Sequence, residues 1–151
     1  MSAALLSLAG LFISAYLYLY KIGKIGTLAC GTGGCETVQL SPWSRFGGVE
    51  VALIGLVGYA TLLLLSLLSL QPPLALKRWP SSALAILAGV GLVFTGYLTY
   101  VELFVLHAIC RWCVASAVII VSIFAVSVLG YARDQGDPEA QSRLSQLSRS
   151  P

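Results

Sequence analysis

The stretch "VELFVLHAICRWCVASAVIIVSIFAVSVL" (residues 101–129) decides the fold class, because it places a Cys-x-x-Cys motif at the start of a long apolar run. About 20 apolar residues are enough to cross the hydrocarbon core of a bilayer. The run from Cys110 to Tyr131 meets this length and contains one charged residue, Arg111. We therefore expect Cys110 and Cys113 to lie at the aqueous end of a membrane-spanning helix.

The composition of the whole chain agrees with a membrane protein. Of its 151 residues, 58% are hydrophobic and 10% are charged, and the mean hydropathy is +0.88, which excludes a soluble globular domain. Apolar runs predict helices over residues 4–20, 49–70, 82–106 and 110–131. We expect an all-α integral membrane protein, a four-transmembrane-helix bundle that forms one domain over residues 1–131. The net charge of +3 comes without a basic patch, which argues against a nucleic-acid partner.

Polar segments join and follow these helices. Residues 71–82 ("QPPLALKRWPSS") contain prolines and charges, which neither continue a helix nor enter lipid. Residues 107–109 are so short a connection that the third and fourth helices must be antiparallel neighbours. Residues 132–151 are polar and poor in aromatics, which predicts a mobile tail.

The first apolar run is expected to be a retained helix and not a signal peptide. A signal peptide carries positive charge before its apolar core, whereas Lys21 and Lys24 follow this run. Small residues that suit close helix packing recur along one face of the run, at Ala3, Ser7, Gly10 and Ser14.

Four antiparallel helices place all four cysteines at one membrane face. The loop between the first two helices carries Cys30 and Cys35, and it lies on the same side as Cys110 and Cys113. Positive charges are divided almost evenly between the two sides, so charge alone barely decides the orientation. If the thiols perform disulfide chemistry, their face should be the oxidising one, with both termini in the cytoplasm.

The residues around the cysteines favour redox chemistry. A helix N-terminus and the neighbouring Arg111 both stabilise a thiolate at Cys110, and Trp112 suits the membrane interface. The glycine-rich "CGTGGC" (residues 30–35) predicts a loop that moves enough for Cys35 to reach the helical pair. Three alternatives stay open at this point: a zinc site with four cysteine ligands, static structural disulfides, and plain buried cysteines.

Redox cysteines at a bilayer surface have a diffusible electron acceptor available to them, a membrane quinone. On the third helix, Thr95, Thr99 and Glu102 share one side, and an ionisable residue within a span normally faces protein or a wet cavity. We therefore expect Glu102 to point inward, where it would relay protons or bond a neighbouring helix. Tyr97 and Phe104, together with Tyr100, occupy the opposite side and are expected to form an interfacial belt more readily than a quinone site.

Two further polar residues have alternative interpretations. Ser41 opens "SPW" (residues 41–43), and its hydroxyl can cap a short helix or donate to a quinone carbonyl. His107 is expected to be an interfacial polar residue and not a proton donor.

The combination of "CGTGGCETVQLSPW" (residues 30–43) with "YLTYVELFVLHAICRWC" (residues 97–113) resembles the bacterial branch of the vitamin K epoxide reductase family. The resemblance covers residues 4–131 and rests on the loop cysteine pair, the following serine and the Cys-x-x-Cys motif together. Pro42 followed by Trp43 departs mildly from the proline and tyrosine that are frequent in bacterial relatives.

The resemblance implies a thiol oxidase in the bacterial cytoplasmic membrane, with its site facing the periplasm or exterior. Cys30 would exchange with a separate thioredoxin-like dithiol protein, Cys35 would pass electrons to Cys110, and Cys113 would reduce a ubiquinone, menaquinone or vitamin K-type quinone. Ser41 matches the serine that lies near the quinone oxygen. The alternatives are a quinone or epoxide reductase of a vitamin K cycle and a non-catalytic membrane metal-binding protein.

Overall fold

The computed structural model describes residues 2–31, 34–71 and 79–136. Its long elements are the helices α1 (Ser2–Lys21), α3 (Val51–Leu68), α5 (Trp79–Tyr100) and α6 (Arg111–Gly136). Four helical stretches are long and apolar enough to cross a membrane, and α5 contributes to one of them together with the turn that follows it. The predicted all-α, four-transmembrane-helix fold is therefore confirmed.

The helix bounds differ from the predicted ones at several ends. Helix α3 begins two residues later than residue 49, because Val49 and Glu50 pair in a short β-hairpin. Helix α5 begins three residues before residue 82. Helix α6 continues to Gly136, so the first part of the predicted tail is helical. The predicted mobility of residues 137–151 lies outside the described residues.

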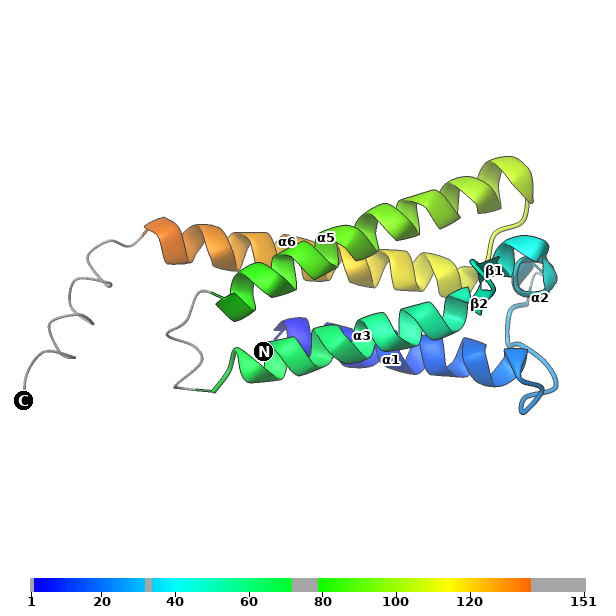
Figure 1. The fold of residues 1–151 in the computed structure, drawn as a ribbon. Coiled ribbons are helices and arrows are strands. Elements are labelled where there is room, and N and C mark those ends of the chain that lie inside the picture. Colours follow the sequence, from blue (N-terminus) through cyan, green and yellow to red (C-terminus); the bar gives the residue numbers. More distant parts are fainter. Residues whose placement is uncertain (1, 32–33, 72–78, 137–151) are drawn as a thin grey trace, which may run out of the picture.

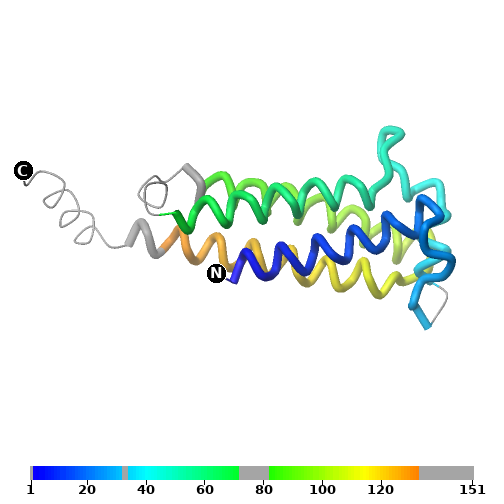
Figure 2. The backbone as a smooth tube through the Cα atoms, turned by 90° about the horizontal axis from the view of Figure 1, so that it is seen from below, coloured from blue at the N-terminus to red at the C-terminus, as the bar shows by residue number. Residues whose placement is uncertain are grey.

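The four helices form a ring in which each packs against two neighbours, in the order α1, α3, α5, α6 (Figures 1 and 2). The segment between α1 and α3 and the turn between α5 and α6 lie together at one end of the bundle (Figure 1). The start of α1 lies toward the opposite end. This arrangement confirms that the cysteine-bearing segments share one end of the molecule.

Small residues allow α1 and α3 to approach each other closely. Ser7, Gly10 and Ser14 on α1 are all buried, as the small-residue face predicted. A Cβ at Gly10 would overlap the ring of Tyr59, and a Cβ at Gly55 would stand 2.9 Å from the Ser14 Oγ. The close contact between α1 and α3 therefore depends on a glycine in each helix, Gly10 and Gly55.

Short elements cover the cysteine end of the bundle, and we call residues 34–50 the cap. The cap contains α2 (Gly34–Leu40), the 3₁₀ turn η1 (Pro42–Ser44), and strands β1 (Arg45–Phe46) and β2 (Val49–Glu50). The hairpin turns at Gly47 and Gly48, whose φ angles of 59° and 86° suit a two-residue turn between antiparallel strands. These short elements were not predicted from the sequence.

Lys21, at the end of α1, fastens the cap to the bundle. Its ammonium donates to the Gln39 carbonyl and to the Ser44 hydroxyl, the latter at 2.8 Å. It also lies 3.4 Å from the carboxylate of Glu50, which accepts a second charged hydrogen bond from Arg45 at 2.6 Å. Because Lys21 and Glu50 are largely shielded from solvent, this network holds the cap more firmly than an exposed ion pair would.

The third span ends in a π-helical turn, η2 (Val101–Val105), where the sequence predicted a regular helix to residue 106. The Leu106 N–H donates to the Val101 carbonyl at 2.9 Å, which is the i to i+5 pattern of a π-turn. His107 then adopts a left-handed φ of 48° and reverses the chain toward α6. His107 is exposed, in agreement with its expected interfacial role.

Candidate active site

The four cysteines gather in one cluster where the cap meets the bundle. Cys30 and Cys35 are joined by a disulfide, and Cys110 and Cys113 are thiols. The side chains of Cys30, Cys35 and Cys110 are buried together with Leu17, Leu28 and Ala52, and Cys113 packs against this cluster. The expected juxtaposition of the loop pair and the helical pair is present.

Gly34 allows the two cysteine pairs to lie side by side. A Cβ at this position would overlap the carbonyl oxygen of Ile109 and would stand 3.2 Å from its carbonyl carbon. Gly34 immediately precedes Cys35, and Ile109 immediately precedes Cys110, so this backbone contact brings their segments together. The loop glycines were predicted to provide mobility, whereas Gly34 permits the close approach of two backbone segments.

Groups at the start of α6 stabilise a thiolate at Cys110, chiefly the Cys113 side chain. The Cys113 N–H donates to the Cys110 Sγ at 3.4 Å. The side chain of Cys113, which also hydrogen-bonds to Cys110, holds the pKa of the Cys110 thiol below its usual value, although burial opposes this shift. The lowered pKa favours the thiolate form, so Cys110 is a better nucleophile than an ordinary cysteine thiol.

Aromatic contacts position the segment that carries Cys30. The ring of Trp112 packs against that of Tyr16 with a centroid separation of 5.2 Å. The Tyr16 hydroxyl accepts a hydrogen bond from the Ala29 N–H at 3.1 Å, one residue before the disulfide. Tyr16 of α1 thus contacts both the start of α6 and the segment that carries the loop disulfide.

Glu102 lies between the helical thiols and the interior of the bundle. Its side chain projects from η2 and is only 6% exposed. One carboxyl oxygen accepts a hydrogen bond from the Cys110 N–H at 3.3 Å, and the side chain is also within hydrogen-bonding reach of Cys113. The inward orientation predicted for Glu102 is present.

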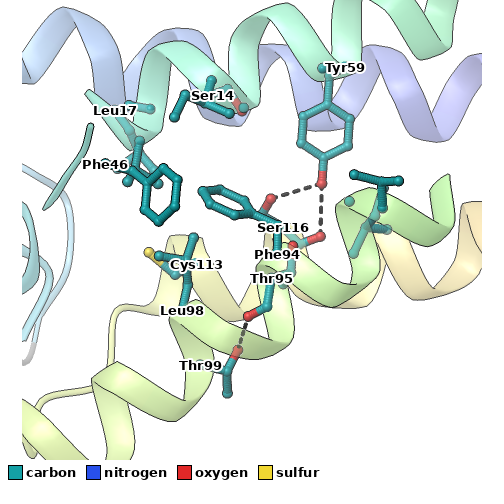
Figure 3. A pocket seen from close by; sticks show the side chains of 18 of the residues that line it. Ser14, Leu17, Phe46, Tyr59, Phe94, Thr95, Leu98, Thr99, Cys113 and Ser116 are labelled. Carbon is teal, nitrogen blue, oxygen red and sulfur yellow. Dashed lines mark hydrogen bonds between the residues drawn. The ribbon is translucent and has the colours of Figure 1, made fainter. Parts of the chain in front are cut away.

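A cavity of about 420 Å³ extends from the thiols into the bundle (Figure 3). All four long helices line it, and the cap contributes Gln39 and Phe46. Its walls are mainly apolar. The polar side chains on its walls are Ser14, Gln39, Tyr59, Thr95, Thr99, Glu102, Cys113 and Ser116.

Tyr59 and Ser116 form a hydrogen-bonded pair in the cavity wall, about one helical turn beyond Cys113. Figure 3 shows Tyr59 reaching from α3 to Ser116 on α6. The Tyr59 hydroxyl lies 2.9 Å from the Ser116 carbonyl oxygen and 2.8 Å from its Oγ. The cavity therefore carries polar groups both at the thiols and at this pair.

The model of the vitamin K epoxide reductase family matches residues 1–128 of this chain. The chain belongs to that family. Members of the family are membrane oxidoreductases, which agrees with redox-capable cysteines at the end of four spans. Among the described residues, no three histidine, cysteine or acidic side chains gather as metal ligands.

Two of the three residues that the resemblance to the vitamin K epoxide reductase family and the sequence place near a quinone lie in the cavity wall. Cys113 and Glu102 line the cavity. Ser41 is not among the lining residues, and its hydroxyl donates to the Val38 carbonyl at 2.7 Å. Ser41 directly precedes η1, but its side chain makes no capping bond there.

The helical faces of α5 are arranged as the sequence predicted. Thr95 and Thr99 line the cavity, whereas Tyr97 is largely exposed on the outer surface. Tyr100 and Phe104 are also exposed and stack on each other with a centroid separation of 4.9 Å. These aromatics occupy the positions of a lipid-facing belt.

Several members of the cavity wall were not predicted from the sequence, among them Gln39, Phe46, Tyr59 and Ser116. Ser116 follows Cys113 by three residues, a spacing that places both on one helix face and could have revealed it. Phe46 and Gln39 carried no comparable signal, because they reach the cavity only through the fold of the cap.

Proposed function

We propose that this protein is a membrane thiol oxidase that passes electrons from a dithiol protein, through its four cysteines, to a membrane quinone. The observation that carries the proposal is the position of the Cys110 and Cys113 thiols, between the Cys30–Cys35 disulfide and an apolar cavity. Such a position suits a relay between a protein partner at the surface and an acceptor dissolved in lipid.

The cavity fits a quinone headgroup in size and chemistry. Its volume of about 420 Å³ lies within the usual range for small-molecule sites, and apolar walls with a few polar groups are typical of them. The aromatic ring of Phe46 lies in the wall beside that of Phe94, at a centroid separation of 5.7 Å. A bound quinone accepts two electrons and two protons, and its ring would be held between these walls with Cys113 at its edge. Ubiquinone, menaquinone and vitamin K-type rings all suit these walls.

Electrons would enter at the loop disulfide. A thiolate of the partner attacks Cys30, which forms a mixed disulfide and releases Cys35 as a thiolate. The second thiol of the partner then displaces Cys30, so that the partner leaves oxidised and the loop pair is reduced.

Electrons would next move from the loop pair to the helical pair. Cys35 attacks Cys110 of a Cys110–Cys113 disulfide and releases Cys113, and Cys30 then attacks Cys35 to regenerate the loop disulfide. Cys110 and Cys113 are left as thiols, which is the distribution that the structure contains. The helical pair then closes its own disulfide again, giving up two electrons to the acceptor and releasing two protons.

The proposed partner is a separate thioredoxin-like dithiol protein, and the proposed location is a bacterial cytoplasmic membrane with the cysteines on the periplasmic or outer side. Exposed residues flank Cys30 on both sides, at Ala29 and Gly31, which supports access from the cysteine end. A persistent disulfide favours an oxidising compartment. Because the start of α1 lies at the other end of the bundle, both termini would face the cytoplasm.

The test is quinone-dependent oxidation of a reduced thioredoxin-like protein by the purified protein. We expect wild type to turn over, Cys113→Ala to lose turnover, and Val114→Ala to retain it because Val114 is an exposed neighbour outside the cavity wall. Failure of wild type to oxidise the dithiol, or normal turnover by Cys113→Ala, would contradict the proposal.

A further inference from the structure

Glu102 is a buried acidic side chain that the cysteine relay itself does not use. We propose that its carboxylate is a catalytic proton-transfer group, which takes the proton from the Cys113 thiol and delivers it to the quinone oxygen in the cavity. This inference rests on the proposed function and deepens it, because it assigns a proton path to the same site.

The position of Glu102 suits this transfer better than any other described group. Its side chain contacts Cys113 and also lines the cavity, so it reaches both the proton donor and the space for the acceptor. The π-helical turn of η2 projects it there, and turns of this kind are frequent at functional sites. The hydrogen bond from the Cys110 N–H fixes one oxygen of the carboxyl group and leaves acceptor capacity on the other.

The surroundings of Glu102 argue against a purely structural carboxylate. Among the described residues that line the cavity there is no lysine or arginine, so no cation there pairs with this carboxyl. Cys110 and Cys113 face it from the start of α6, and Tyr59 is the titratable group that α3 adds to the wall. A buried acidic group inside a span costs free energy, and a neutral glutamine could accept the same N–H bond at lower cost.

The cationic side chains at the cysteine end of the bundle are either engaged elsewhere or exposed. Lys21 pairs with Glu50 and donates to the Ser44 hydroxyl. Arg45 is exposed and also pairs with Glu50, and Arg111 is exposed at the start of α6. The carboxyl of Glu102 thus faces thiols and an apolar space, which is the environment of a group that exchanges protons and not of an ion pair.

The step balances in electrons and protons. Disulfide formation between Cys110 and Cys113 releases two electrons, both accepted by the quinone, and two protons. The Cys113 proton passes to Glu102 and from there to a quinone oxygen. The Cys110 proton, which leaves readily because Cys110 favours the thiolate, goes to water at the cysteine end, and the second proton of the hydroquinone is taken from that water.

The test separates the two half-reactions in single-turnover experiments on the full chain. In the first, fully reduced protein is mixed anaerobically with a soluble quinone and quinone reduction is followed across a pH series. In the second, protein with its Cys30–Cys35 disulfide is mixed with a reduced dithiol protein in the absence of quinone. Wild type is compared with Glu102→Gln and Glu102→Asp, and thermal unfolding is measured for each.

We expect Glu102→Gln to slow quinone reduction by about 100-fold or more, because a positioned proton-transfer group typically accelerates a reaction by at least that factor. The wild-type rate should rise as the carboxyl ionises with increasing pH, and Glu102→Gln should lose this rise. Glu102→Asp should restore part of the rate and the pH dependence. Exchange with the dithiol protein should be unchanged in both variants.

Three outcomes would overturn the inference. The first is quinone reduction by Glu102→Gln at the wild-type rate and with the wild-type pH profile. The second is equal slowing of both half-reactions by Glu102→Gln. The third is a Glu102→Asp protein that folds normally and yet restores no pH dependence. Failure of wild type itself to reduce quinone would instead contradict the proposed function, so the two failures are distinguishable.

Discussion

Gly34→Ala tests whether close backbone packing is what couples the two cysteine pairs. Gly34 begins α2 and lies against the backbone of Ile109, and a Cβ there would overlap the Ile109 carbonyl oxygen. Ile109 belongs to the short connection between η2 and α6, so its backbone has little freedom to retreat. We expect the first turn of α2, which carries Cys35, to move away from Cys110.

The size of the effect follows from the contact distances. The added Cβ would stand 3.2 Å from the Ile109 carbonyl carbon and closer still to its oxygen, whereas comfortable carbon–carbon contacts are about 3.5–4.0 Å. Relief of this overlap requires a shift on the order of 1 Å, and a misplacement of that size can cost about 100-fold in rate. The overlap should also destabilise the fold by about 1–3 kcal/mol.

The assay uses a background in which only Cys35 and Cys110 remain, made by Cys30→Ser and Cys113→Ser. Formation of the Cys35–Cys110 disulfide under a mild oxidant is followed by loss of reactivity toward a maleimide-polymer label. We expect Gly34→Ala to slow this cross-link by about 10–100-fold.

Gly96→Ala is the matched control, because a Cβ at that glycine of α5 meets no atom within 4 Å. It should cross-link at the rate of the parent protein. An unchanged rate for Gly34→Ala would refute the role given to this glycine, as would equal slowing by Gly96→Ala.

Three further predictions concern the thiolate, the helix contact and the cap. Because Cys113 lowers the pKa of Cys110, the thiolate absorbance of the disulfide-containing protein should rise at a lower pH than that of an ordinary cysteine. Cys113→Ala should move this rise to higher pH, and an unmoved midpoint would contradict the assigned cause. Gly10→Ala should lower the free energy of unfolding in detergent by about 1–3 kcal/mol, since its Cβ overlaps the Tyr59 ring, and an unchanged denaturation curve would contradict this packing. Lys21→Met should raise the KM for quinone with a smaller effect on exchange with the dithiol, because it frees the cap that closes the cavity; equal KM values would show that the cap is held without it.

The sequence was sufficient to predict the four spans and the shared location of the cysteines. Long apolar runs are an unambiguous signal for membrane helices, and antiparallel topology then places Cys30, Cys35, Cys110 and Cys113 at one end. The inward direction of Glu102 also followed from its spacing with polar neighbours and from the cost of a carboxyl in lipid.

The cap could not be predicted in the same way. Helix α2 has 7 residues and each strand has 2, so none of them presents a repeating apolar pattern long enough to identify. The role of Gly34 depends on Ile109, far away in the sequence, and a glycine alone signals freedom as readily as close contact.

The residues that line the cavity could not be predicted from the sequence for a related reason. Helix α3 is apolar on all sides because lipid covers its outer face, so the inner position of Tyr59 leaves no amphipathic pattern. Residue type also left Ser41 undecided between a helix cap and a quinone contact. Its hydroxyl donates to the Val38 carbonyl in α2 and makes no capping bond to η1.

The central claim is that the helical thiols reduce the quinone directly, and the most direct measurement is a single turnover of the Cys30→Ser, Cys35→Ser protein. This variant keeps only Cys110 and Cys113 as thiols. After reduction and removal of the reductant, it is mixed anaerobically with a quinone, and both quinone consumption and remaining thiols are counted. We expect one quinone to be reduced for each pair of thiols lost, with a disulfide between Cys110 and Cys113 in the product. Quinone left unreduced, or thiols retained while quinone is consumed, would contradict the claim.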